Sequence, residues 1–326
     1  MKTDKKTIDD AYRRIINHSK SGFVGYDVVS DCVDPRNGKH LFDPASTSYE
    51  RFSTFRNNDV DYDADASIEA NVIYDRTFGS IINRLDKKSI RTEQDLLGRY
   101  NRYGLKYELG DPDSSGGLSF RGDTMNSVAT TNRAYYWSHK ELHNDKKMDG
   151  FPWPNETLKL MDLYHTPGNF MILPFREGFS INCARGTGST HDYFDLYLLA
   201  IYNFYLKQNE RDPYNDITLG SVLKNDKELV LFMTVYLLPF MEDDKDMTDN
   251  VLPGWQSFIE KNLFRDFVGQ NEYGYFDRPK ELWEGHFNDP PETNGKPATE
   301  EQFMQFYTNA ADSIRKRSGR IYDRLH

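Results

Sequence analysis

Cysteine is scarce in this sequence, which has only Cys32 and Cys183 among its 326 residues. Small secreted domains that depend on disulfides carry several cysteines, so a disulfide framework is excluded and a reducing compartment is expected. Residues 1–14, MKTDKKTIDDAYRR, lack the apolar segment of a secretory signal peptide. No run approaches the roughly 20 apolar residues that cross a bilayer. We therefore expect a cytoplasmic protein that does not enter a membrane.

Positive charge is also in deficit. The 41 Lys and Arg residues are outnumbered by 51 Asp and Glu residues, which gives a formal net charge of -10. This balance argues against broad electrostatic attraction to nucleic acid or to an anionic membrane, and leaves room only for a local basic groove. The densest basic cluster is Arg315, Lys316, Arg317 and Arg320. We interpret it as cations that favour the dipole at the end of a predicted helix.

Aromatic residues, in contrast, are abundant, with 21 Phe and 21 Tyr. A disordered chain carries few of them, so we expect a globular protein with an aromatic core. Apolar spacing and capping residues predict helices. These cover residues 8–16, 68–103 with a second start at Thr92, 194–205, 217–238, 255–268 and 300–322, the last with Thr299 and Gln302 in capping-box spacing.

Two regions break the helical pattern. Residues 22–65 contain Gly, Pro, Asn and Asp around short apolar pieces such as FVGYDVV, so we predict loops with one or two short strands there. A buried strand is predicted at residues 170–173. The chain therefore reads as a predominantly helical α+β protein, with short strands around a central aromatic-rich helix at 194–205.

The domain organisation depends on one stretch, GDPDSSGG at residues 110–117. It is either a boundary between an N-terminal part, 1–109, and a larger helical part, 118–326, or a surface loop. We expect a single globular domain over residues 1–326.

Two clusters suggest metal sites and fail in register. Asp59, Asp61, Asp63 and Asp65 alternate as in a calcium loop, but the glycine and the bidentate glutamate that such a loop needs are missing. His139 and His143 are four residues apart, as zinc ligands on a helix can be, but Lys140 stands where a metalloprotease has its glutamate. We predict an exposed acidic loop, two surface histidines and no metal.

A glycine-rich turn, RGTGST at residues 185–190, precedes the predicted central helix. Free backbone N–H groups and the positive end of a helix dipole can hold a phosphate, and Arg185 would add a bidentate contact. The candidate anion-binding residues are Arg185, Gly186, Gly188 and Ser189. The alternative is that Ser189 or Thr190 simply caps the helix.

Upstream of this turn lies a second polar group. His165, Thr166 and Asn169 surround a Pro167–Gly168 turn that enters the predicted strand. A histidine and an amide at such a turn can orient water or substrate. They can equally hold the turn together through hydrogen bonds to backbone groups.

The segment resembles the central signature of an uncharacterised bacterial domain-of-unknown-function family. HTPGNFMILP, INCARG and DYFDLYLLAIYNFY, within residues 165–205, are similar to that family's HTIGN-like piece, NQARG and DRFDLTLECIRRYY-like helix. Residues 25–38, 118–127 and 254–268 are similar to further pieces, so the resemblance covers most of the chain. The sequence departs from the family's pattern at residues 41–55, LFDPASTSYERFSTF. The resemblance implies a bacterial origin and no particular activity.

A shorter resemblance, of about twenty residues, is to the HTLGN segment of histidine–asparagine nucleases of the modified-DNA restriction class. It implies that His165 and Asn169 lie near a metal site and that Asn182 is the later asparagine. The upstream acidic-histidine and proline motif of those enzymes does not occur before Leu163.

Our leading hypothesis from the sequence is an enzyme that acts on a phosphate-bearing substrate, a nucleic acid or nucleotide, in a setting such as phage defence or toxin-type conflict. His165 would be the general acid or base, Asn169 and Asn182 would orient it, and Arg185 with the turn would bind the phosphate. The alternative is a non-catalytic scaffold or interaction protein with a protein partner. The sequence specifies no cofactor.

Overall fold

A computed structural model gives the arrangement of the chain. It describes residues 5–28, 64–85, 100–101, 104–105, 119–126, 128–176, 179–180, 193–222, 232–248, 250–288 and 295–326. Helices dominate, and the described strands form short antiparallel sheets, so the predicted helical α+β class is confirmed. The candidate boundary at 110–117 lies outside the described residues.

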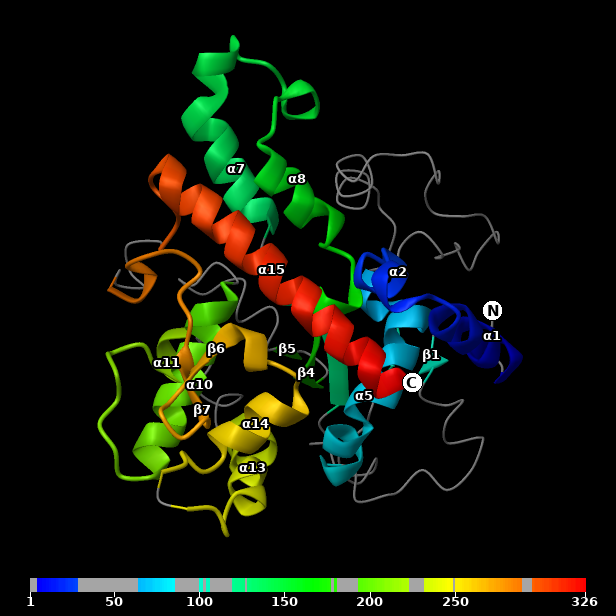
Figure 1. Ribbon diagram of the computed structural model, residues 1–326, viewed down its shortest axis with the longest axis vertical. Helices are drawn as coiled ribbons and strands as arrows, with labels where there is room; N and C mark the ends of the chain where they lie inside the picture. Colours follow the sequence, from blue (N-terminus) through cyan, green and yellow to red (C-terminus); the bar gives the residue numbers. More distant parts are fainter. Residues whose placement is uncertain are drawn as a thin grey trace.

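The longest helix, α15 (Glu300–Leu325), crosses the middle of the molecule (Figure 1). It begins where predicted, because Thr299 accepts a hydrogen bond from the Gln302 backbone and the Gln302 side chain accepts one from the Thr299 backbone. Its buried residues recur every three or four positions, from Phe303 to Leu325. This stripe packs against α2, α5, α8 and the turn before β4, so α15 organises the core.

The second core helix, α10 (Phe194–Gln208), matches the predicted aromatic-rich helix. It is buried around nearly its whole girth, since every residue from Phe194 to Leu206 except Tyr202 is buried. Edge-on ring contacts join its start to the C-terminal part of the chain, with Phe194 4.9 Å from both Phe264 and Phe267 between ring centroids.

A small sheet orders the strands as β3 (Ser119–Thr124), β4 (Phe170–Arg176) and β5 (Phe179–Ser180), all antiparallel. The predicted strand at 170–173 is thus confirmed, and it extends to Arg176. Pairing runs from Ser119 opposite Phe175 to Thr124 opposite Phe170. The ladder continues one step, because Met125 donates its backbone N–H to Asn169.

The N-terminal elements pack beside the end of α15 (Figure 1). They are α1 (Lys5–Ile16), α2 (Lys20–Val24), the 3-10 turn η1 (Ala64–Ala66) and α5 (Ile68–Leu85). Arg14 on α1 pairs with the buried carboxylate of Glu69 on α5 at 2.6 Å. Lys20 on α2 pairs with Asp323 on α15, also at 2.6 Å.

A helical hairpin projects from the opposite end of α15 (Figure 1). It consists of α7 (Val128–His139), the 3-10 turns η2 (Lys140–His143) and η3 (Met148–Gly150), and α8 (Asn155–Asp162). Tyr135 anchors α7 to α15 by an edge contact with Phe303, 5.2 Å between ring centroids.

The remaining elements lie on the other side of α15. They are α11 (Leu219–Val222), the π-helix η5 (Phe232–Leu237), α13 (Leu238–Asp243), α14 (Trp255–Lys261), η6 (Arg265–Phe267), the hairpin β6 (Val268–Gln270) and β7 (Phe276–Pro279), and η7 (His286–Asn288). Buried Asp244 accepts hydrogen bonds from the N–H groups of Gly254 and Ser257, which fixes the start of α14.

Three local predictions were wrong. Phe23 and Val24 lie in a helix rather than a strand, because Ser19 accepts a hydrogen bond from the Gly22 N–H and caps α2. Residues 100–101 and 104–105 form the short strands β1 (Tyr100–Asn101) and β2 (Gly104–Leu105) rather than the end of a helix. The helix predicted at residues 255–268 ends at Lys261, because the left-handed backbone of Leu263 turns the chain.

Within the described ranges, no helix is both long enough and apolar enough to cross a membrane.

Candidate functional site

The turn that precedes β4 carries the described part of the predicted site. It is the 3-10 turn η4 (Pro167–Asn169). Asn169 is fully buried, and its side-chain amide donates to the Tyr164 carbonyl at 2.9 Å. The Thr166 hydroxyl donates to the Leu163 carbonyl at 2.7 Å. These polar groups therefore hold the turn together, as the structural alternative expects.

His165 lies on the same turn and is only 5% exposed. Its Nδ1 is 3.9 Å from Oδ1 of Asp27, and its ring contacts Tyr164 at 4.9 Å between centroids. The His165 carbonyl accepts the N–H of Val28 at 3.0 Å. The imidazole thus faces the segment that follows α2. A general acid or base must reach a substrate, and little of the His165 side chain is exposed in this conformation, so its catalytic role stays a prediction.

The same turn is clamped onto α15. The Gly168 N–H donates to the Ser318 hydroxyl at 2.9 Å, and the Arg317 guanidinium donates to the Gly168 carbonyl at 3.0 Å. A Cβ at Gly168 would collide with the Ile314 carbonyl and the Ser318 side chain, so only glycine fits. These contacts fix the turn, and with it the start of β4, to the central helix α15.

Arg317 also overturns our interpretation of the basic cluster, because its side chain is fully buried and not placed at a helix end. It donates to the carbonyls of Asn262, Gly168 and Phe170, and its guanidinium lies 4.9 Å from the Phe264 ring centroid. Burial lowers its pKa to about 9. The helix itself continues to Leu325.

The other predicted site residues lie outside the described part of the chain. They are Asn182, Arg185, Gly186, Gly188 and Ser189. Their convergence with His165 and Asn169 therefore stays a prediction. Cys32 and Cys183 also fall outside the described residues.

The two candidate metal clusters have separate outcomes. Asp65 is buried in η1, contrary to the predicted exposed loop, while Asp59, Asp61 and Asp63 lie outside the described residues. His139 places its Nε2 2.9 Å from Glu300, and the His143 ring contacts Phe151. No group of three metal-binding side chains occurs among the residues that the structure describes.

A buried Asp–His pair was not predicted. Nδ1 of His286 lies 2.6 Å from Oδ2 of Asp195, and the two side chains are at most 2% exposed. The same oxygen accepts the Leu282 N–H at 2.8 Å. The Trp283 ring stacks on the imidazole at 3.5 Å between centroids. The pair thereby ties η7 to the start of α10, although it joins positions 91 residues apart.

Nε2 of His286 has no hydrogen-bond partner among the residues that the structure describes, which is unusual for a buried nitrogen. The chain at Gly295 packs against it, since a Cβ there would lie 3.5 Å from Nε2. Asp195 fixes the ring orientation as an orienting carboxylate does in catalytic pairs. The enclosure of Nε2, however, makes the pair a packing device in this conformation.

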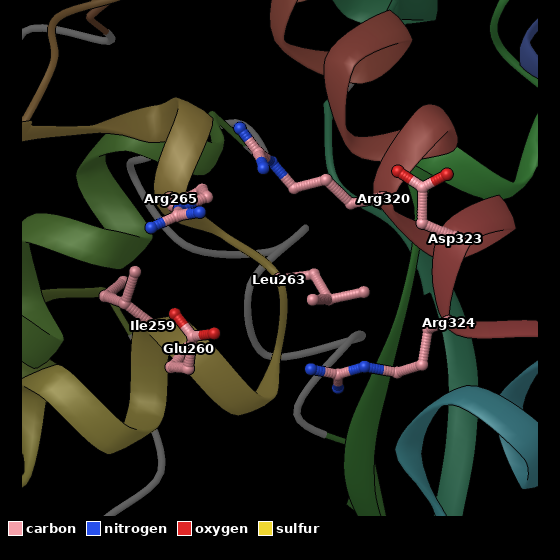
Figure 2. A pocket seen from close by; sticks show the side chains of 7 residues that line it. All are labelled: Ile259, Glu260, Leu263, Arg265, Arg320, Asp323 and Arg324. Carbon is pink, nitrogen blue, oxygen red and sulfur yellow. The ribbon is translucent and has the colours of Figure 1, made fainter.

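An open groove of about 260 Å³ lies between α14 and the last turns of α15 (Figure 2). We call it the arginine groove; it is lined by Ile259, Glu260, Leu263, Arg265, Arg320, Asp323 and Arg324. In Figure 2 the Arg320 and Arg324 side chains extend from α15 toward the segment that carries Glu260 and Arg265. Three arginine residues therefore line one small groove.

Two charges at the groove are already paired. Arg320 makes a bidentate contact with Asp266, Nε to Oδ2 at 2.7 Å and Nη2 to Oδ1 at 2.9 Å, and this raises its pKa. Asp323 pairs with Lys20. Each pair has a net charge of zero, so Arg320 and Asp323 contribute to the shape of the groove more than to its net charge.

The other charges are less completely paired. Nη1 of Arg324 donates to the carbonyls of Lys261 and Thr77, at 3.2 and 3.4 Å, which holds the side chain in place. Partial burial lowers the pKa of Arg324, and the carboxylate of Glu260 opposes that effect. The Arg265 guanidinium lies 5.5 Å from the Phe276 ring centroid and makes no hydrogen bond within the described residues.

The floor of the groove depends on an unusual backbone. Leu263 has a φ of 58°, in the left-handed region that usually takes glycine after a helix. Its N–H donates to Glu260 and that of Phe264 donates to Ile259, which closes α14 in a Schellman motif. A leucine there accepts backbone strain and places its side chain under the three arginines.

No protein-family model matches the chain, and neither a curated protein nor a solved structure is similar enough to count as a match. The resemblances noted from the sequence therefore stay predictions. Any function must be argued from the geometry of this chain.

Proposed function

We propose that the protein binds a phosphate-bearing ligand in the arginine groove. The observation that carries the proposal is that three arginine residues, Arg265, Arg320 and Arg324, line one small groove that opens to solvent. Guanidinium groups match phosphate oxygens geometrically and keep their charge at any physiological pH. The proposal keeps the phosphate-bearing ligand that the sequence suggested and gives it a different place.

Donors remain for such a ligand. The Nε and Nη2 groups of Arg324 are not used in the contacts that hold Nη1, and Nη1 of Arg320 is not used in its pair with Asp266. Arg265 offers its whole guanidinium edge. A phosphate between them would replace water with charge-assisted hydrogen bonds, each contributing about 1.5–3 kcal/mol.

The enzymatic part of the sequence hypothesis stays a prediction. Glu260 and Asp323 are the carboxylates that line the groove, and neither His165 nor His286 lines it. Binding is therefore the function that the groove's geometry supports, and a reaction on the bound ligand would require a group beyond these residues.

The test is calorimetric titration of the full chain with inorganic phosphate and with adenosine 5′-monophosphate. Arg265→Gln and Arg324→Gln should each weaken binding at least about tenfold. The matched control is Arg133→Gln, an exposed arginine on α7 that removes the same charge away from the groove. An equal loss in the control would reduce the effect to general electrostatics, and no heat with either anion would remove the proposal.

A second function, protein interaction, is favoured by the α7–α8 hairpin. Three of the six exposed large apolar side chains in the described structure belong to it: Trp137, Leu142 and Leu158. Trp137 is 59% and Leu142 76% exposed. Exposed apolar side chains that gather on one face mark interaction surfaces, and these belong to one hairpin. Sedimentation velocity tests a second copy as the partner. Association that depends on concentration and is lost in the Trp137→Ser/Leu142→Ser double variant would support this function.

A further inference from the structure

The charge on the arginine groove bears on which phosphate it recognises; this step rests on the proposed function. Of the groove's ionic side chains, Arg320 and Asp323 are neutralised by Asp266 and Lys20. What remains is Arg265 and Arg324 against one carboxylate, Glu260. The unbalanced charge is thus a single positive charge, spread over two cations on opposite walls.

Glu260 competes with any anion that binds here. Its carboxylate lines the same groove and stabilises the charged form of Arg324, so it also repels the negative charge of a ligand. The sum of the charges at the groove is nevertheless positive. A ligand with about two negative charges is therefore attracted about twice as strongly as a ligand with one.

The number of acceptor oxygens points the same way. A terminal phosphate presents three strong acceptor oxygens and carries a charge of about -1.5 to -2 at pH 7. A phosphodiester has two free oxygens and one charge. Arg265, Arg320 and Arg324 each have at least one donor group without a partner in the described structure, so donors are available for three oxygens.

The size of the groove limits what else enters. Its volume of about 260 Å³ is below the roughly 300–1,000 Å³ of pockets that enclose a whole drug-sized ligand. Glu260, Arg265, Asp323 and Arg324 are all exposed, so the groove opens to solvent. The phosphate group fits inside while the rest of its molecule lies outside.

From these observations we infer that the arginine groove recognises a terminal phosphate, a phosphomonoester dianion, in preference to a phosphodiester. Arg265 and Arg324 attract the phosphate from the two walls of the groove, and Nη1 of Arg320, which the pair with Asp266 leaves unused, is available to a phosphate oxygen. The carbonyls of Thr77 and Lys261 hold the Arg324 side chain in place. Glu260 lowers the affinity for every anion without reversing the preference.

The test compares methyl phosphate with dimethyl phosphate by calorimetric titration of the full chain at pH 7.5. Methyl phosphate should bind at least about tenfold more tightly, and this preference should shrink at pH 5.5, because the second phosphate pKa is about 6. Dimethyl phosphate affinity should not change with pH. Glu260→Gln should strengthen the binding of both esters, and that of methyl phosphate more, because a carboxylate repels a dianion about twice as strongly as a monoanion. Arg133→Gln should leave both affinities unchanged.

The outcomes separate the two proposals. If neither ester binds, both the proposed function and the preference for a terminal phosphate fail. If both bind equally and Arg324→Gln weakens both, the phosphate-binding function stands and the preference is refuted. If Glu260→Gln weakens methyl phosphate binding, the competing role of Glu260 is refuted. Unfolding midpoints of every variant, measured by circular dichroism, verify that each is folded.

Discussion

The buried guanidinium of Arg317 leads to a prediction that reverses the usual ranking of substitutions. We compare Arg317→Lys, which keeps the charge, with Arg317→Met, which removes it. Arg317 is fully buried, has no carboxylate partner, and donates to the carbonyls of Gly168, Phe170 and Asn262. The planar guanidinium reaches all three carbonyls at once, which an ammonium group does not do.

The magnitudes follow from these contacts. Methionine leaves three buried carbonyls without a donor, at about 1–3 kcal/mol each. It also removes a buried charge, whose lowered pKa of about 9 corresponds to about 5 kcal/mol of burial cost. The net change in the free energy of unfolding therefore lies between a stabilisation of roughly 2 kcal/mol and a destabilisation of roughly 4 kcal/mol. A lysine reaches about one of the three carbonyls, so about two are left without a donor, and the cost of burying an ionisable group remains. Arg317→Lys should therefore be about 2 kcal/mol less stable than Arg317→Met at pH 7.

The pH dependence of the stability of Arg317→Lys provides an independent test of the buried charge. Burial lowers the pKa of a lysine, so at pH 7 the folded variant holds a neutral amine while the unfolded chain holds a charged one. The unfolded state binds more protons, so the free energy of unfolding rises with pH, by about 1.4 kcal/mol per unit. From pH 7 to 9, Arg317→Lys should approach and then exceed the stability of Arg317→Met.

The assay is urea unfolding of both variants and wild type, followed by tryptophan fluorescence at pH 7 and pH 9. The wild-type protein controls for other titrating groups, because its own Arg317 stays mostly protonated below about pH 9. A lysine variant that is more stable than the methionine variant at pH 7, or a gap between them that does not change with pH, would refute this account of the buried charge.

Three further predictions concern other joints of the fold. Gly168→Ala should lower the free energy of unfolding in urea by about 2 kcal/mol or more, because its Cβ would collide with the α15 backbone. The control Gly150→Ala, which has open space around its Cβ, should lower it by less than about 1 kcal/mol. Equal effects would contradict the close packing of Gly168 against α15. Asp195→Asn should lower the unfolding midpoint by weakening the contact to His286, yet leave phosphate affinity unchanged; altered affinity would show that the pair acts on the groove. Burial and a nearby carboxylate raise the pKa of Tyr202 to about 12, so the unfolded chain loses that proton first and stability falls as pH rises above about 10. Tyr202→Phe should reduce this fall, measured by circular dichroism between pH 9 and 12, and an unchanged slope would contradict the assignment.

The elements predicted best are those whose signals are local. The capping box of Thr299 and Gln302 indicates the start of α15. Apolar residues on nearly all sides of residues 194–205 indicate the buried helix α10. The strand at Phe170 follows from its apolar run. Each depends on neighbours within a few positions, so a pattern of period or cap suffices.

The arginine groove was missed because its walls are some sixty residues apart in the sequence, at 259–265 and 320–324. A signal for Arg317 was present, however. Ile314, Arg317, Ile321 and Leu325 recur at helical spacing, so the arginine lies on the apolar stripe and not on the solvated face. Asp195 gave a similar signal, since a carboxylate in an otherwise apolar helix needs a buried partner.

The central place of α15 has a consequence for the order of events during synthesis. Residues 300–325 supply the surface on which α2, α5, α8 and the η4 turn are packed, although all of these are made earlier. Residues 300–325 must therefore be synthesised before α2, α5 and α8 can find this neighbour. Until then the apolar faces of α5 and α8 that pack on α15 stay uncovered, which leaves them open to non-native contacts during synthesis.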